Sequence, residues 1–538
     1  MGSLEAYVAA LFFYLFGSSS WALKLVPLIF SACFFVLCVH LARTLYGRRV
    51  GMLTALLLVF SSPFFLVWSV KARGGYMETL FFGTALFILA RKLLLYADTD
   101  PAGKQERSRG RLRLALNGLL LLTVFLLGLQ VVNGGLHLQV GGLSISSRGY
   151  VRPLIALVFF WWAGHILCGG DPLRWSGLAT PYWKTMALFG FTAGLAWWTN
   201  PLVCFYLLPL IPVLGWHLRR TLCSGSAQLY LVATFVLLFF LGSLPHWLYG
   251  YFEGFSGGGV TGLADMEKWL LQGQGFFTVA LPRLVGCWFD FTTHPLVAGC
   301  SVVVMAVYGF SLLFLAGRLG IRLFSRSGFR QQEAMETVFF LFLLCYPLLF
   351  SVSSMGWFIS RPRYLLPLFS VLPIVTAVFF AQVLDRSRII FSFLMIPFMV
   401  LSLLQIATLD LASFQPWVHN VRLPLRFSPL IQRLKEKNIR YAYADYWIAY
   451  RLVFESREEI ICSVYPSTVN DRYPPYTELV GRARAPAYII MQTRSSGFEK
   501  MLKDMHIRGY RKERLYPFVL FYDVERSSAV EEETPVNQ

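Results

Sequence analysis

The chain has 538 residues, of which 56% are hydrophobic and 14% are charged, and its mean hydropathy is +0.57. A soluble domain cannot bury so large an apolar share, so the composition excludes a soluble globular protein and indicates an all-α polytopic membrane protein. The net charge of +19 comes mainly from basic residues in short loops, which set membrane topology, so it does not indicate nucleic-acid binding.

The first predicted element is a short amphipathic run in MGSLEAYVAALFFYLFG, which carries Glu5 and ends at Gly17. We expect residues 1–20 to be the remnant of an outer loop, followed by a transmembrane domain over 21–410. About twelve apolar spans are predicted there, near 21–44, 51–70, 77–95, 113–133, 151–168, 184–199, 200–216, 228–250, 296–316, 335–355, 364–385 and 388–410.

The loops between these spans alternate between basic and weakly charged. Basic residues gather at 48–49, 104–111, 219–220, 318–330 and 386–388, which predicts that these loops are cytoplasmic. An even number of spans then places both Met1 and the tail on the outer side of a plasma membrane, the bacterial inner membrane. No signal peptide precedes Met1, so we expect a transmembrane helix upstream of it. The alternative is a true start whose first run loops outward unaided.

The composition changes after residue 410. Residues 411–525 are predicted to form a small C-terminal α/β domain, in which PAYIIMQ and FVLFYDV are strands and GFEKMLKDM is a helix. The domain would be extracytoplasmic, and the polar residues 526–538 would be a disordered tail.

Two basic clusters lie on the predicted outer side, against the usual charge bias of translocated loops. They occur in WSVKARGGYMETL and GWFISRPRYLLP, and their candidate residues for binding a donor phosphate are Lys71, Arg73, Tyr76, Arg361, Arg363 and Tyr364. Interfacial snorkelling or pairing with lipid headgroups is the alternative.

Further polar residues are candidates for the cavity or the acceptor side of a site. They are Glu78, Asn200 of WWTNP, and Asp265, Asp290 and His294 of the long loop 251–295. A simple hairpin explains Asn200 equally well, and a structural or solvated role explains the loop residues. The nine cysteines have no metal-ligand spacing, and we interpret them as small core side chains.

The motifs LYGRRVG, WSVKARGGY, WWTNP and RPRYLLP, in this order, resemble those of the GT-C fold integral-membrane glycosyltransferases. The similar branch is the bacterial one related to dolichyl-phosphate-mannose protein mannosyltransferases and lipid A aminoarabinose transferases. The tail motifs YADYWIAYRL and DRYPPY resemble the soluble C-terminal domain of one bacterial subgroup.

The resemblance implies transfer of a sugar from a polyprenyl-phosphate donor to a glycan, lipid or protein acceptor on the outer face. In such enzymes an acidic residue of the first outer loop acts as base or binds a divalent metal cation. That acid would lie upstream of Met1, and Glu5 is the one carboxylate left in the loop. The sequence does not identify the metal, the sugar or the acceptor.

Two other classes of function remain open at this point. A transporter or flippase of lipid-linked sugars also needs many helices and outer basic residues, although transporters usually carry charged or broken helices near the midplane. A non-catalytic membrane partner is the third hypothesis, with its tail recruiting an acceptor or another subunit.

Overall fold

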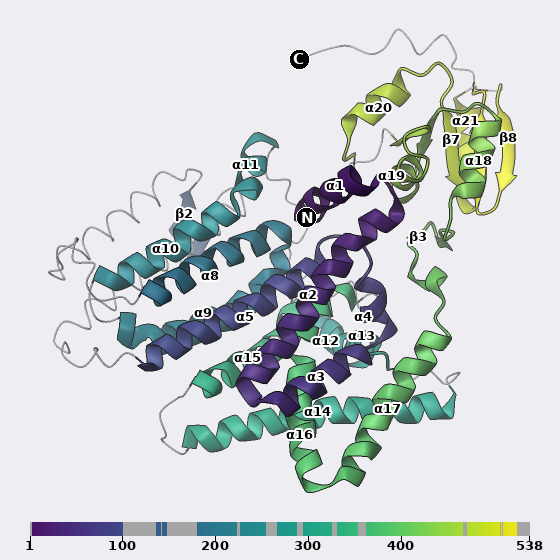
Figure 1. Ribbon diagram of the computed structural model, residues 1–538. Helices are drawn as coiled ribbons and strands as arrows, with labels where there is room; N and C mark the ends of the chain where they lie inside the picture. Colours follow the sequence, from purple (N-terminus) through teal and green to yellow (C-terminus); the bar gives the residue numbers. More distant parts are fainter. Residues whose placement is uncertain are drawn as a thin grey trace. The chain divides into compact units, whose positions relative to one another are not determined.

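The computed structural model describes residues 3–99, 136–140, 143–147, 180–222, 226–253, 266–287, 294–324, 331–352, 362–465, 471–505, 507 and 509–524. The described chain forms two compact units. The first comprises residues 1–11 and 24–407, and the second comprises residues 12–23 and 408–538. The first unit is helical apart from one hairpin, and the second contains a small sheet (Figure 1).

The elements up to residue 407 are mostly α-helices. They are α1 (Ser3–Phe16), α2 (Ser20–Tyr46), α3 (Arg48–Val59), α4 (Pro63–Trp68), α5 (Tyr76–Thr99), the hairpin β1 (Leu136–Val140) and β2 (Leu143–Ser147), α8 (Thr180–Thr199), η2 (Pro201–Val203), α9 (Cys204–Leu222), α10 (Ser226–Gly242), α11 (Leu244–Glu253), α12 (Met266–Gly275), η3 (Phe276–Ala280), α13 (Leu281–Val285), α14 (Pro295–Phe324), α15 (Gln331–Val352), η5 (Pro362–Ser370), α16 (Leu372–Arg386) and α17 (Arg388–Ala407).

Four of the described helices are long and apolar enough to cross a membrane. They are Ser20–Tyr46, Pro295–Ile321, Gln332–Val352 and Arg388–Ala407, and two bent helix pairs raise the number to as many as six. The chain is therefore a multi-pass membrane protein by the length and composition of these helices. The predicted count of twelve is not confirmed, and the predicted spans 113–133 and 151–168 both lie wholly outside the described residues.

Three of the predicted spans are broken in the structure. The span predicted at 51–70 is divided into α3 and α4, because Ser62 accepts a hydrogen bond from the Phe65 N–H (3.3 Å) and Pro63 begins a new helix. The spans predicted at 228–250 and 364–385 are helix pairs bent by 58° and 49°. Pro245 and Pro373 lie near the start of the second helix of each pair and lack the N–H that continuity would require.

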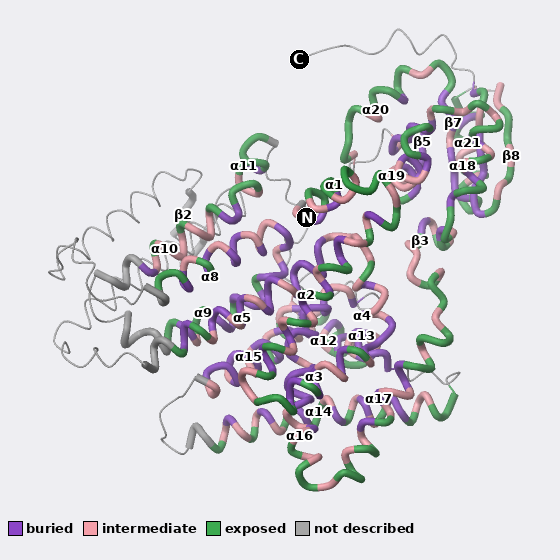
Figure 2. The backbone as a smooth tube through the Cα atoms, in the orientation of Figure 1, coloured by how far each residue is buried: buried purple, intermediate pink, exposed green. Residues whose placement is uncertain are grey.

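Large apolar side chains fill the core of the first unit. Buried positions are dense along α3, α5 and α15, and exposed positions are frequent on α17 (Figure 2). Helices α8 and α10 pack side by side (Figure 1), and glycine permits their close approach. A Cβ atom on Gly190 would lie 2.7 Å from the Phe235 carbonyl oxygen, and one on Gly194 or Gly242 would lie closer still to a carbonyl of the other helix.

The second unit contains a five-stranded mixed sheet with the order β6-β5-β7-β9-β8. Its elements from residue 408 are η6 (Leu411–Phe414), β3 (Trp417–Val418), β4 (Val421–Arg422), α18 (Ser428–Glu436), β5 (Tyr441–Ala444), α19 (Tyr446–Glu455), β6 (Ile461–Val464), α20 (Pro474–Gly481), β7 (Ala487–Met491), η7 (Gln492–Arg494), α21 (Ser495–Asp504), β8 (Arg511–Leu515) and β9 (Phe518–Tyr522). Strands β6, β5 and β7 are parallel, whereas β9 is antiparallel to β7 and β8. A mostly helical chain with a small C-terminal sheet region agrees with the predicted fold class.

Candidate active site

The carboxylate of Glu5 lies in a concavity formed by backbone N–H groups. The Gly75 N–H donates to Glu5 Oε2 at 3.0 Å, and the N–H groups of Arg73 and Gly74 also hydrogen-bond to this carboxylate. Gly74 and Gly75 have φ values of 79° and 67°, a conformation that glycine adopts without strain. Successive N–H groups in such a turn make an anion-binding nest. The sequence RGG therefore builds a receptor for the Glu5 side chain.

A second carboxyl group lies beside Glu5. Glu78, in the first turn of α5, is only 1% exposed and is close enough to Glu5 for their charges to interact. Its Oε1 atom has no hydrogen-bond partner among the described residues. Burial raises the pKa of Glu5 to about 7, although its three backbone hydrogen bonds act in the opposite direction. A carboxyl group with this pKa exchanges protons near neutral pH.

Cations and aromatic rings surround Tyr76, which lies in the sequence between the glycine turn and Glu78. The rings of Trp68, Tyr76 and Tyr364 form a chain with centroid separations of 5.0 and 6.0 Å. Lys71 Nζ lies 5.2 Å from the Trp68 ring, and the Arg363 guanidinium lies 5.0 Å from the Tyr364 ring. Arg363 also donates to the Tyr364 hydroxyl at 3.3 Å. The structure thus joins the two basic clusters that the sequence placed about 290 residues apart.

Buried polar contacts hold η5, which carries Arg363 and Tyr364. The Tyr346 hydroxyl donates to the Tyr364 carbonyl oxygen at 2.5 Å. Further along η5, the Ser370 hydroxyl is bonded to the Tyr206 hydroxyl (2.8 Å) and accepts from Thr84 (3.1 Å). These contacts come from α15, α9 and α5, so three helices fix the position of the arginine.

Asn200 supports the other side of the site. Its Nδ2 donates to the Gly74 carbonyl oxygen at 2.8 Å, and its Oδ1 accepts from the Leu202 N–H at 3.0 Å. The side chain is 3% exposed, so both ends of the amide are satisfied within the protein. Asn200 therefore begins η2 and at the same time holds the glycine turn that binds Glu5.

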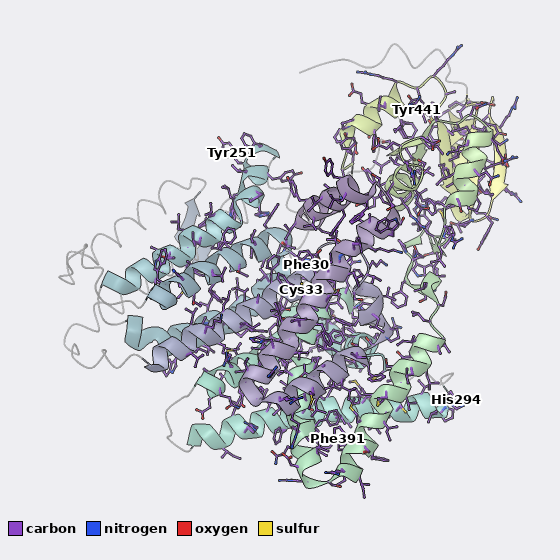
Figure 3. All side chains as sticks on the ribbon, viewed as in Figure 1. Phe30, Cys33, Tyr251, His294, Phe391 and Tyr441 are labelled. Atoms are coloured by element: carbon purple, nitrogen blue, oxygen red, sulfur yellow. The ribbon has the colours of Figure 1, made fainter. Side chains whose placement is uncertain are left out.

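The remaining predicted site residues are His294, Arg361, Asp265 and Asp290. His294 is exposed at the start of α14, where its Nδ1 accepts from the Leu296 N–H at 3.2 Å, and it lies well away from Phe30 in the middle of α2 (Figure 3). Arg361, Asp265 and Asp290 lie outside the described residues. The described ranges contain no group of three or more His, Cys, Asp or Glu side chains that fits a metal ion. Glu5 and Glu78 alone make a poor site for a divalent cation.

Trp68, Gly74 and Gly75 were not among the residues that the sequence predicted to be functional. A signal for the glycines was present, because a Gly–Gly pair between a cation and an aromatic residue indicates a tight turn with positive φ. Trp68 gave no comparable signal, since a tryptophan at the end of an apolar span is also typical of the membrane interface.

Comparison with known proteins agrees with the resemblance noted in the motifs. Residues 3–96 match the family model of the dolichyl-phosphate-mannose-protein mannosyltransferases. The match includes five of the candidate site residues, namely Glu5, Lys71, Arg73, Tyr76 and Glu78. It confirms, over this segment, the similarity to integral-membrane glycosyltransferases. No curated protein matches the chain.

Solved structures of two transferases are also similar to the chain. One is the oligosaccharyltransferase AglB from Archaeoglobus fulgidus in complex with an inhibitory peptide and a dolichol-phosphate, at 11% identity and a TM-score of 0.42. The alignment covers 100% of this chain and 67% of AglB, so the chain spans about two thirds of that protein. ArnT from Cupriavidus metallidurans bound to undecaprenyl phosphate has 13% identity and a TM-score of 0.26, covering 97% of this chain and 87% of ArnT.

Proposed function

We propose that this protein is a membrane glycosyltransferase that moves a sugar from a polyprenyl-phosphate donor to an acceptor outside the cytoplasm. The observation that carries the proposal is the convergence of Glu5 and Glu78 with Lys71, Arg73 and Arg363 around one glycine turn. The family match over residues 3–96 supports the same class of reaction. The alternation of basic loops supports an orientation with the C-terminal domain outside, and we propose a bacterial inner membrane as the location.

Glu5, rather than the acid that the family resemblance placed upstream of Met1, is the base in this proposal. Attack on the anomeric carbon needs an acceptor hydroxyl whose proton is removed as the new bond forms. A carboxylate with a pKa of about 7 is a stronger base than an ordinary glutamate, yet it is still substantially ionised at neutral pH. The hydrogen bonds of the backbone nest lower the pKa of Glu5, but burial raises it by more, so Glu5 keeps its raised basicity.

The cations bind the donor phosphate. As the bond from the sugar to the lipid phosphate breaks, negative charge develops on the departing phosphate. Arg363 offers a planar fork to two phosphate oxygens, and Lys71 and Arg73 offer further positive charge from the facing turn. The rings of Trp68, Tyr76 and Tyr364 limit water near these cations, which strengthens their effect on charge.

The test is the Glu5→Gln variant of the full protein, purified in lipid nanodiscs and supplied with a polyprenyl-phosphate-sugar donor. Glutamine keeps an oxygen for the backbone nest but cannot accept the proton, so we expect sugar transfer to fall by about a hundredfold or more. In the unaltered protein, kcat/KM should rise with pH up to about 7 and then level off, because the active form of Glu5 is deprotonated.

Glu267→Gln is the matched control, because Glu267 is an exposed glutamate on α12. It should transfer sugar like the unaltered protein. If Glu5→Gln transfers sugar as fast as the unaltered protein, Glu5 is not the base. Movement of the donor lipid between leaflets without any transfer would instead support a flippase and overturn the proposed reaction.

A further inference from the structure

The C-terminal sheet has a crevice-forming topology at the carboxyl ends of its parallel strands. Helix α19, which follows β5, packs on the face of the sheet that holds Ala442 and Ala444. Helices α20 and α21, which follow β6 and β7, pack on the opposite face through Val480 and Leu502. The chain therefore leaves the neighbouring strands β5 and β7 toward opposite faces. In open α/β sheets, ligands bind where the connections diverge in this way.

Four side chains of different chemistry meet at this edge. Asp445 follows β5, Tyr465 follows β6, and Arg494 follows β7, and the turn between β3 and β4 contributes His419. His419 Nε2 lies 3.5 Å from Asp445 Oδ2, and the Thr493 hydroxyl donates to the His419 carbonyl oxygen at 3.0 Å. The charge of Arg494 acts on both His419 and Tyr465, so the three groups lie in the same region, and the Tyr465 hydroxyl donates to the Ile489 carbonyl oxygen at 2.8 Å.

The cluster is accessible to solvent within its own unit. The side chains of Asp445 and His419 are 26% and 27% exposed, and Arg494 is exposed. A membrane-facing or core role would not leave an acid, an imidazole and a guanidinium open to water in one group. Asp445 uses Oδ1 to accept from the Trp447 N–H at 3.1 Å, which leaves Oδ2 toward His419 and the crevice.

Aromatic rings and a second arginine border the cluster. The rings of Tyr446 and Trp447 are 4.9 Å apart at the start of α19, and the Arg472 guanidinium lies 5.3 Å from the Tyr446 ring. Trp447 is 36% exposed, which is a large open area for an indole. Exposed aromatic faces suit the apolar face of a sugar ring, and arginine suits a carboxylate or phosphate.

We propose that this edge of the C-terminal sheet binds an anionic saccharide, one that carries a carboxylate or a phosphate. Arg494 and Arg472 bind the anionic group, Asp445 accepts hydrogen bonds from sugar hydroxyls, and Trp447 covers one face of the ring. The site is separate in the chain from the Glu5 cluster, and its ligand binding does not depend on the proposed transfer reaction.

The test is isothermal titration calorimetry of the intact protein in detergent. The protein is titrated separately with glucuronic acid, glucose 6-phosphate and neutral glucose. We expect saturable binding of at least one anionic sugar and weaker or no binding of glucose. Arg494→Gln should weaken that binding by about tenfold or more, because it removes a charge-assisted hydrogen bond. Comparing the two anionic sugars distinguishes a carboxylate ligand from a phosphate ligand.

Arg511→Gln is the control, because Arg511 is an exposed arginine on β8, at the far edge of the same sheet. It should bind the sugars like the unaltered protein. The proposal is overturned if neither anionic sugar binds saturably, or if Arg494→Gln and Arg511→Gln bind equally well. Because no donor lipid is present, these outcomes are independent of whether the protein transfers sugar.

Discussion

At the residue scale, the site depends on backbone groups as much as on side chains. The Glu5 carboxylate is held by N–H groups of the turn at 73–75, and that turn is held in place by Asn200. Leaving a buried carbonyl oxygen or carboxylate without a hydrogen-bond partner costs folding free energy. The Glu5 carboxylate therefore requires the N–H groups of the turn, and the Gly74 carbonyl oxygen of that turn requires the Asn200 amide. Asn200 acts in this proposal as a positioning residue, because it reaches the turn and not the reacting groups.

Asn200→Asp tests that role. Aspartate still accepts from the Leu202 N–H, but it has no donor for the Gly74 carbonyl oxygen and turns a carboxylate oxygen toward it. We expect transfer to fall by about tenfold or more, together with a lower thermal unfolding temperature. Asn438→Asp, in a turn of the C-terminal unit, is the control. Unchanged transfer and unfolding in Asn200→Asp would show that the contact does not position the site.

Part of this arrangement follows from the sequence and part does not. The residue types of both basic clusters predicted a phosphate site, and both were expected on the same membrane face. That Tyr76 and Tyr364 bring the two clusters together is seen only in the structure. The contact of Asn200 with Gly74 spans 126 positions and involves a backbone atom, which has no residue-type signature. The loop residue His294 illustrates the reverse case, because a histidine that suggested chemistry occupies a helix start.

At the element scale, the close packing of α8 and α10 depends on Gly190, Gly194 and Gly242. Apolar composition predicted these two helices, but it could not predict that they touch backbone to backbone. Composition also predicted continuous spans where the chain is broken or bent. The breaks occur at Ser62 and Pro63, at Pro245 and at Pro373. Mean hydropathy taken over a window of many residues does not detect the effect of a single proline on the helix.

Gly194→Ala tests the glycine contact. The added methyl group would overlap the Phe239 carbonyl oxygen, so the two helices must separate. We expect a loss of about 1–3 kcal/mol in stability, measured as a lower unfolding temperature of the purified protein. Gly299→Ala on α14 is the control, because a Cβ there meets nothing within 4 Å. Equal unfolding temperatures for the two variants would contradict this account of the packing.

At the scale of the whole molecule, the charge distribution predicts the orientation in the membrane. The turn between α16 and α17 carries Arg386 and Arg388 and should face the cytoplasm. The C-terminal unit should face the outside, where an acceptor is available.

Cysteine labelling in intact cells measures this orientation. In a protein whose native cysteines are replaced by alanine, Ser496→Cys should react with a membrane-impermeant maleimide added outside. Ser387→Cys should react only after the membrane is permeabilised. The opposite pattern would reverse the predicted topology and place the C-terminal unit in the cytoplasm.

The backbone contact between α8 and α10 also has a consequence for the thermodynamics of donor binding. Two helices in such close contact cannot rotate freely against each other, and Asn200 directly follows the last residue of α8. The side-chain amide of Asn200 therefore connects the turn at 73–75 to a rigid helix pair and restricts the motion of the turn. A receptor that is ordered before its ligand arrives loses little conformational entropy on binding. We therefore expect donor affinity to come from preorganisation of the empty site rather than from closure around the lipid.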